Sequence, residues 1–299
     1  MNNPLLDPSL HRQLQARCGG QYLILNFGGG RLKQIINPKQ NAPRHTASLR
    51  MIYKLDQHGV LPDGTLILNT SDLPIVRVNE ADVFEYPVLS YSTSPEYIDR
   101  VLPDFIFDGW PEAGLASYQI LYDRLKGLNT TNWDERLPYL YWSGSATNSI
   151  RQACIDQFRT DPRVSFHLIQ GSKNLTKENI ATPIGYAPFQ AVDHFKYLLD
   201  LPGNGYSGRA KLLLLTGGFL VRFTHQLRLT EYWEDDCPES AYEVIEQLDH
   251  LEKFLDRMSE DEAAFRERAD WGQLWARYMF HPKTVALAMF KVIEKALLS

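Results

Sequence analysis

A glycine-rich turn at residues 203–208 lies between a strand-like segment (196–201) and a helix-like run (209–215). A helix that opens on such a turn presents unpaired backbone N–H groups and the positive end of its dipole, and both favour a phosphate. Glycines allow left-handed conformations and a close approach of the backbone to a ligand, and basic side chains add charge. The turn therefore predicts a nucleotide phosphate site, with these candidate residues: Gly203, Gly205, Gly208, Arg209 and Lys211.

The kind of nucleotide follows from what comes after the turn. A dinucleotide-binding motif is normally followed, about twenty residues later, by an acidic residue at the end of the second strand. Here the segment 218–223 runs into Thr224 and His225 with no acid at its end. An NAD-dependent oxidoreductase is therefore the less favoured alternative. Lys196 and Tyr197 begin the first strand and could touch the nucleotide, although Tyr197 fits a core position equally well.

A carboxylate follows another apolar segment. Residues 65–69 read as a strand, and Asp72 comes just after it, before the turn at Pro74. In open α/β sheets, ligands collect at the carboxyl ends of strands, so Asp72 is well placed for chemistry. The alternative is that Asp72 caps the turn.

Residues 102–112 are dense in aromatic side chains and turn formers and include Trp110 and Glu112. Such a loop suits stacking against a sugar ring or a base, and aromatic packing beneath a loop is the alternative. We take Trp110 and Glu112 as candidate acceptor or sugar contacts.

Composition excludes several classes of protein. The 299 residues carry a formal net charge of −5 and are 44% hydrophobic and 22% charged, which fits a soluble two-domain enzyme and argues against a nucleic-acid binder. No uncharged apolar run approaches the roughly eighteen residues of a membrane span, and the N-terminus lacks the pattern of a secretory signal. The three cysteines, Cys18, Cys154 and Cys237, have no metal-binding spacing. We expect a cytoplasmic protein.

Strand-like and helix-like segments alternate, which is typical of α/β layers. The expected strands are 22–27, 65–69, 88–91, 139–142, 164–169, 196–201 and 219–223. The expected helices are 46–57, 114–128, 149–159, 189–195, 209–215, 240–258, 260–275 and 282–298. Polar turn formers at 127–132 predict a domain boundary.

Four motifs in order resemble glycosyltransferase family 90, which includes protein O-glucosyltransferases and capsule xylosyltransferases. They are the Asn-x-x-Asp-x-Pro of residues 69–74, the Pro-Asp-Phe-x-Phe-x-Gly-Trp-Pro-Glu of 103–112, the Tyr-Trp-Ser-Gly-Ser-x-Thr of 141–147, and the Lys-Tyr-Leu and Ser-x-Arg-x-Lys around the glycine turn. The resemblance implies a GT-B-like α/β fold with two Rossmann-like domains facing a central cleft. Residues 1–130 would form the acceptor-side domain and 131–281 the donor-binding domain, and the helix 282–298 could pack back on the first.

The resemblance also implies roles for single residues. Asp72 matches the family's catalytic base, and the position of Glu231 matches an acid that could meet the ribose. Donor contacts would come from Ser207, Arg209 and Lys211 and from Ser143, Gly144, Ser145 and Arg151. Many relatives carry arginine where this chain has Ser143, so a phosphate-facing cation is either absent or supplied by Arg151.

The expected chemistry is an inverting transfer of glucose, galactose or xylose from a UDP-sugar to a hydroxyl. It needs a base for the acceptor proton and positive charge for the departing diphosphate. No apolar strand ends in the Asp-x-Asp of metal-dependent enzymes, so we expect no metal and no cofactor besides the co-substrate. The expected acceptor is a glycan or lipid-linked glycan of a surface polysaccharide or lipopolysaccharide. The helix 282–298 could touch the inner face of a membrane. A non-catalytic nucleotide-binding or glycan-binding module is the second alternative.

Overall fold

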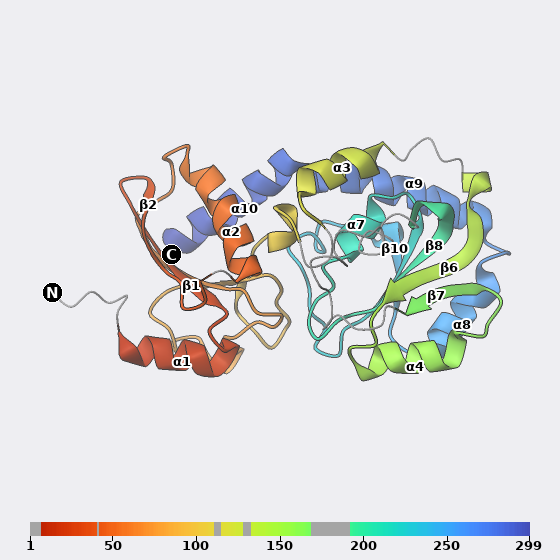
Figure 1. Cartoon of the computed structure of the whole chain (residues 1–299), viewed down its shortest axis with the longest axis horizontal. Coiled ribbons are helices and arrows are strands. Elements are labelled where there is room, and N and C mark those ends of the chain that lie inside the picture. The colour runs from red at the N-terminus through yellow and green to blue at the C-terminus, as the bar shows by residue number, and fades with distance from the viewer. Residues whose placement is uncertain (1–6, 41, 111–114, 128–132, 169–191) are drawn as a thin grey trace. The chain divides into compact units, whose positions relative to one another are not determined.

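The computed structural model describes residues 7–40, 42–110, 115–127, 133–168 and 192–299, which form two compact units (Figure 1). The first unit comprises Met1–Trp110, Leu227–Asp235 and Pro282–Ser299, and the second comprises Pro111–Gln226 and Asp236–His281. Each unit contains a sheet and helices, so the expectation of a mixed α/β protein is confirmed.

The sheet of the first unit has the strand order β2-β1-β3-β4-β5. Its strands are β1 (Tyr22–Gly28), β2 (Arg31–Ile36), β3 (Gly64–Asn69), β4 (Val88–Ser90) and β5 (Arg100–Val101). β1 pairs antiparallel with both β2 and β3, whereas β3, β4 and β5 run parallel. The carboxyl ends of β3 and β4 therefore lie at the same edge, where Asp72 follows β3.

Helices cover both faces of this sheet. α1 (Pro8–Cys18) packs through Leu10 and Leu14 on one face, in a core that includes Ile24 and Ile67. α2 (Pro43–Asp56) contacts β2, and α10 (Pro282–Leu297) contacts α2, β3 and β5. Successive side chains of a strand point to opposite faces of the sheet. Because helices cover both faces, all of residues 22–25 are buried.

The sheet of the second unit is parallel throughout, in the order β10-β9-β8-β6-β7. Its strands are β6 (Leu137–Gly144), β7 (Val164–Leu168), β8 (Phe195–Asp200), β9 (Phe219–Phe223) and β10 (Tyr242–Ile245). β8 and β9 are buried at every position, as expected for central strands covered on both faces. The parallel order brings the carboxyl ends of β6, β8 and β9 together.

The helices of the second unit are α3 (Tyr118–Lys126), α4 (Ser149–Phe158), α7 (Ala210–Leu214), α8 (Leu248–Arg257) and α9 (Glu262–Met279). In Figure 1, α4 and α8 lie on one side of the sheet and α7 lies on the other. Aromatic side chains from strands and helices meet in the core, where Phe219 contacts both Phe254 and Phe265.

Several elements differ from the sequence prediction. α1, β2, β5 and β10 were not predicted, and residues 242–245, expected as helix, form the edge strand β10 beside β9. The signals for α1 were present, because Asp7 caps its first turn, Pro8 opens it and Gly19 ends it with a φ of 58°. Of the expected helix 189–195, residues 189–191 lie outside the described part of the chain; Val192–His194 is a 3-10 turn and Phe195 begins β8.

Candidate functional site

The glycine turn leaves the carboxyl end of β8, where the last residue of the strand is a buried carboxylate. The Asp200 side chain is 1% exposed, and its Oδ1 accepts a hydrogen bond from Ser207 Oγ at 2.5 Å. This bond ties the far end of the turn to the strand from which the turn departs. Because the other strands are parallel, Asp200 also lies beside the ends of β6 and β9.

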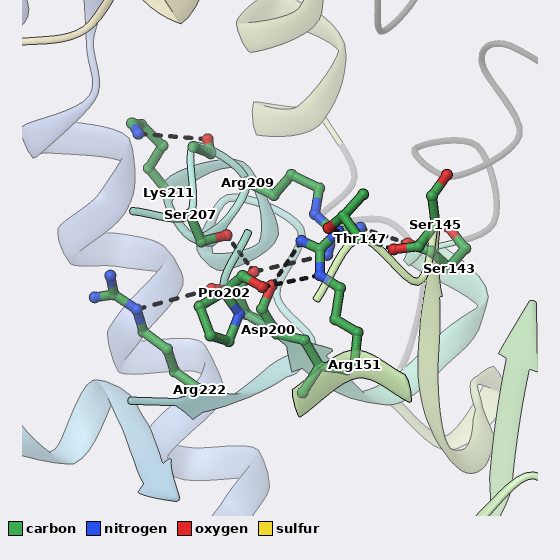
Figure 2. Close-up of polar contacts among 12 residues, drawn as sticks. Ser143, Ser145, Thr147, Arg151, Asp200, Pro202, Ser207, Arg209, Lys211 and Arg222 are labelled. Carbon is green, nitrogen blue, oxygen red and sulfur yellow. Dashed lines mark hydrogen bonds and ion pairs between the residues drawn. The ribbon is translucent and has the colours of Figure 1, made fainter. Parts of the chain in front are cut away.

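Two guanidinium groups flank Asp200 from different elements (Figure 2). Arg209 Nη2 lies 3.9 Å from Oδ1, and Nε of Arg222, on β9, lies 3.7 Å from Oδ2. Sequence reasoning missed Asp200 and Arg222. The pattern that selected Asp72, an acid at the end of an apolar strand, is nonetheless also present at Asp200.

Arg209 also reaches across to β6. It donates a hydrogen bond to the carbonyl of Ser143, whereas its Nη2 makes no hydrogen bond to any described residue. Burial lowers the pKa of the Arg209 guanidinium, because a low-dielectric surrounding disfavours the charged form. A pocket adjoins this side chain and is lined by Tyr141, Trp142, Ser143, Val192, Leu199, Arg209 and Leu213. The guanidinium is thus anchored on one side and has donor capacity left on the other.

Arg151, on α4, fastens the turn through the backbone. Its Nε and Nη2 donate to the carbonyls of Pro202 and Leu201, both at 2.9 Å. Its Nη1 donates to the carbonyl of Ser145 at 3.1 Å and to Thr147 Oγ1 at 3.2 Å. Burial, followed by repulsion from Arg209, lowers the pKa of Arg151 to about 10. Because so many of its donors serve the protein's own backbone, Arg151 is a clamp for the turn.

The N-cap of α4 holds the same turn. Asn148 Nδ2 donates to the carbonyls of Pro202 and Gly203, at 2.9 and 2.7 Å, while its Oδ1 accepts from the N–H of Arg151. Together with Arg151, this side chain connects the end of β6 to the end of β8.

Two expectations about the turn were wrong. None of Gly203, Gly205 and Gly208 is among the glycines with a positive φ, so left-handed backbone is not their role. The helix that follows, α7, has five residues, too short to supply the dipole expected of it. A Cβ at Gly203 would make only an ordinary van der Waals contact, 3.8 Å from Arg151 Nη2, whereas a Cβ at Gly144 would meet the Trp142 ring at 2.8 Å.

Three further candidates, Lys211, Lys196 and Tyr197, are buried. Lys211 is fully buried, with Nζ 3.4 Å from the Gly208 carbonyl and 5.6 Å from the centre of the Tyr206 ring. Lys196 pairs with Glu262 at 2.5 Å, and Tyr197 donates to the Met258 carbonyl at 2.6 Å. Both are at the start of β8, whereas the turn leaves its end, so the structure does not bring them to the turn.

Asp72 lies in the first unit, on the turn that follows β3. Asn69, the last residue of that strand, organises this turn: its Nδ2 donates to the Leu73 carbonyl at 2.7 Å, and its Oδ1 accepts from the N–H and Oγ of Ser71. The Asp72 side chain is 42% exposed, and its Oδ1 accepts a hydrogen bond from Arg44 Nη1 at 2.7 Å. Among the described residues, Arg44 thus holds this carboxylate, which remains open to solvent.

A buried acid supports the chain beyond Asp72. Asp99 accepts from the N–H groups of Ile75 and Val76, at 2.9 and 2.8 Å, and from Ser90 Oγ at 2.6 Å. Burial raises the pKa of Asp99, and these hydrogen bonds oppose that rise. Asp99 therefore fixes the path of residues 75–76 against the end of β4.

The other candidates differ in their surroundings. Trp110 packs edge-on against Phe105, with ring centres 5.9 Å apart. Glu112 lies outside the described residues. Glu231 is buried in the segment Leu227–Asp235, which belongs to the unit of Asp72, and its N–H donates to Glu234 Oε1 at 2.7 Å.

Within the described residues, no group of three or more His, Cys, Asp or Glu side chains could hold a metal ion. In the same part of the chain, no helix combines the length and apolar character needed to cross a bilayer.

Comparison with known proteins identifies the family. The model of glycosyl transferase family 90 matches residues 46–296. This match covers most of the chain and includes both Asp72 and the glycine turn, so the chain belongs to glycosyl transferase family 90.

Three curated proteins that resemble this chain are named as O-glucosyltransferases or as a homolog of one. The chain is 27% identical over 165 residues to O-glucosyltransferase rumi of Drosophila pseudoobscura pseudoobscura, covering 52% of this chain and 40% of that protein. It is 25% identical over 211 residues to O-glucosyltransferase rumi of Drosophila melanogaster, covering 65% and 51%. It is also 25% identical over 232 residues to the O-glucosyltransferase rumi homolog of Anopheles gambiae, covering 72% and 57%. The chain spans about half the length of the curated relatives it matches.

Proposed function

We propose that this protein is a glycosyltransferase that moves a sugar from a UDP-sugar to a hydroxyl group of a glycan acceptor. The observation that carries the proposal is the cluster at the end of β8, where Arg209 and Arg222 flank the carboxylate of Asp200. Guanidinium groups at the end of a buried strand suit a diphosphate, and Nη2 of Arg209 makes no hydrogen bond to the described residues.

The proposed reaction divides its chemistry between two groups. Asp72 accepts the proton of the acceptor hydroxyl as that oxygen bonds to the anomeric carbon of the sugar. The bond between that carbon and the diphosphate oxygen breaks, and its electron pair leaves with UDP, whose charge Arg209 stabilises. A single displacement of this kind inverts the anomeric centre.

The proposal also covers the arrangement of the two units, the donor sugar and the cellular context. We propose a GT-B-like arrangement in which the first unit carries the acceptor and the second unit the donor, with arginines rather than a metal ion countering the diphosphate. The N-terminal part of the first unit ends at Trp110 rather than at the expected residue 130, and this unit also includes Leu227–Asp235. The relatives named O-glucosyltransferase make UDP-glucose the first donor to test, before UDP-galactose and UDP-xylose. A cytoplasmic enzyme of surface-glycan synthesis is the proposed context.

Donor binding and turnover test this function separately. Calorimetry should detect binding of UDP and no comparable binding of NAD. Release of UDP from UDP-glucose, UDP-galactose and UDP-xylose should then be followed with and without EDTA. Asp72→Asn should keep the UDP affinity but lower turnover by about a hundred-fold or more. NAD binding in place of UDP would point to the oxidoreductase, whereas UDP binding without turnover on any donor would point to a non-catalytic module.

A further inference from the structure

The carboxylate proposed as the base has one protein partner among the described residues, and that partner is Arg44 on α2. Arg44 Nη1 donates to Asp72 Oδ1 at 2.7 Å and lies 3.3 Å from the carbonyl oxygen of Thr70. One guanidinium nitrogen thus contacts both the side chain and the backbone of the same turn. Such a contact fixes the carboxylate relative to the strand end from which the turn departs.

An aromatic cluster restrains Arg44 from another side. The guanidinium carbon lies 5.1 Å from the centre of the Phe105 ring, within the range of a cation–π contact. Phe105 is 3% exposed and packs against Tyr91 and Trp110, with ring centres 5.7 and 5.9 Å away. An arginine packed on a buried ring loses few conformations when it also binds a carboxylate, so its geometry is set before any acceptor arrives.

We propose that Arg44 is the positioning residue of the general base. It holds Oδ1 of Asp72 and leaves the other oxygen, on a side chain that is 42% exposed, to accept the acceptor's proton. This inference rests on the proposed function, in which Asp72 takes that proton while the sugar–diphosphate bond breaks. Arg44 lies outside residues 46–296, so the family match does not point to it.

The same unit contains a matched control. Arg17 Nη1 pairs with Glu80 at 2.7 Å and donates to the Ile75 carbonyl at 2.8 Å, and its guanidinium lies 5.5 Å from the centre of the Phe84 ring. Its contacts are thus of the same three kinds as those of Arg44, but its acid is not Asp72. Arg17→Ala therefore reports what the loss of such a set of contacts does to the fold alone.

A kinetic double-mutant cycle tests the proposal. UDP release is measured from UDP-glucose, UDP-galactose and UDP-xylose, with water and with octyl β-glucoside as acceptors. The proteins compared are the wild type, Arg44→Ala, Arg44→Lys, Asp72→Asn, the double variant Arg44→Ala/Asp72→Asn and Arg17→Ala. Arg44→Ala should lower kcat about 10- to 100-fold, since small displacements of a reacting group have effects of this size. The donor KM should stay within about twofold. Arg44→Lys should restore part of the rate, because an ammonium can pair with the carboxylate but cannot reproduce the planar stacking.

The outcomes separate the two proposals. If Arg44 acts through Asp72, the double variant should be no slower than Asp72→Asn. Arg17→Ala should keep the wild-type kcat within about threefold, although its melting temperature should fall about as much as that of Arg44→Ala. Additive losses, or a wild-type kcat in Arg44→Ala while Asp72→Asn is inactive, would overturn the role of Arg44 and leave the proposed function standing. A wild-type protein that releases no UDP from any donor would refute the proposed function, and the role of Arg44 with it.

Discussion

Arg209 donates a hydrogen bond to the main-chain carbonyl of Ser143, so the guanidinium that follows the glycine turn of β8 is anchored on the end of β6. This relationship bears on Ser143, the position at which the family resemblance predicts an arginine. The sequence left Arg151 as a possible replacement cation. Its hydrogen bonds to the carbonyls of Ser145, Leu201 and Pro202 instead favour Arg209 as the group that meets a diphosphate.

The first prediction concerns Arg209→Ala. Removing a charge-assisted contact to a phosphate typically costs about 1.5–3 kcal/mol, so the affinity for UDP should fall roughly 10- to 100-fold. Isothermal titration calorimetry with UDP measures this directly. Arg266→Ala, which removes an arginine of the same unit that is 46% exposed and paired with Asp134, is the control and should leave the affinity unchanged. Equal affinities in all three proteins would remove Arg209 from the donor site.

The second prediction concerns Arg151→Lys, which keeps the charge but loses the forked geometry. A lysine cannot reach the carbonyls of Leu201, Pro202 and Ser145 together, and an unsatisfied buried carbonyl costs on the order of 1–3 kcal/mol. Urea unfolding should therefore show a loss of about 3 kcal/mol, together with weaker UDP binding, because the turn is no longer held. Arg163→Lys, at a more exposed pair with Asp161, is the matched control. A stability within about 0.5 kcal/mol of the wild type would mean that the clamp contributes nothing.

Most sheet strands were predictable because each is a short apolar run. Residues 65–69 and 219–223 are strands in the structure within one residue of the expected bounds. β10 was not predictable by the same means, since its exposed edge position leaves Glu243 and Val244 on a strand whose composition also fits a helix. Pairing with β9, which is a tertiary interaction, decides its conformation.

The site was predictable only in part, for a related reason. Charged residues near a glycine turn are visible in sequence, and this was enough to select Arg209, whereas Ser207 was selected from the family resemblance. Partners that come from other elements were missed: Arg222 of β9, which lies beside Asp200, and Arg44, which pairs with Asp72 from a helix that begins 29 residues before it. No local spacing encodes such contacts, because each depends on the tertiary structure of its own unit.

The third prediction concerns Gly144→Ala at the end of β6. The added methyl group would lie 2.8 Å from the Trp142 ring, which is 1% exposed and cannot move without disturbing the core. Overpacking of this kind costs about 1–3 kcal/mol. Because Ser143 precedes this residue and anchors Arg209, UDP affinity should fall as well. Gly203→Ala, whose nearest neighbour would lie at 3.8 Å, should be tolerated; similar melting temperatures for the two variants would contradict the packing argument.

The last prediction concerns pH and His45, on α2 beside Arg44. Nδ1 of this buried histidine lies 2.7 Å from Asn37 Oδ1, and its Nε2 has no hydrogen-bond partner among the described residues. Burial, with repulsion from Lys39, lowers the pKa of His45 to about 4. The unfolded chain, with an ordinary histidine pKa of about 6.5, binds the proton first as the pH falls. Stability is therefore complete above pH 6.5 and is lost progressively down to pH 4, by about 3 kcal/mol in total.

Urea unfolding gives the free energy of unfolding of the wild type and of His45→Gln at each pH between 7 and 4. The contribution of His45 is the difference between the slopes of these two free energies against pH, because the effect of carboxylates common to both proteins cancels. The wild type should lose stability more steeply than His45→Gln over this range, since glutamine has no proton to take up. His58→Gln replaces an exposed histidine of the same unit and controls for the loss of a surface imidazole. Parallel curves for the wild type and His45→Gln would mean that the imidazole is protonated in the folded protein, and that an acceptor for Nε2–H exists beside α2.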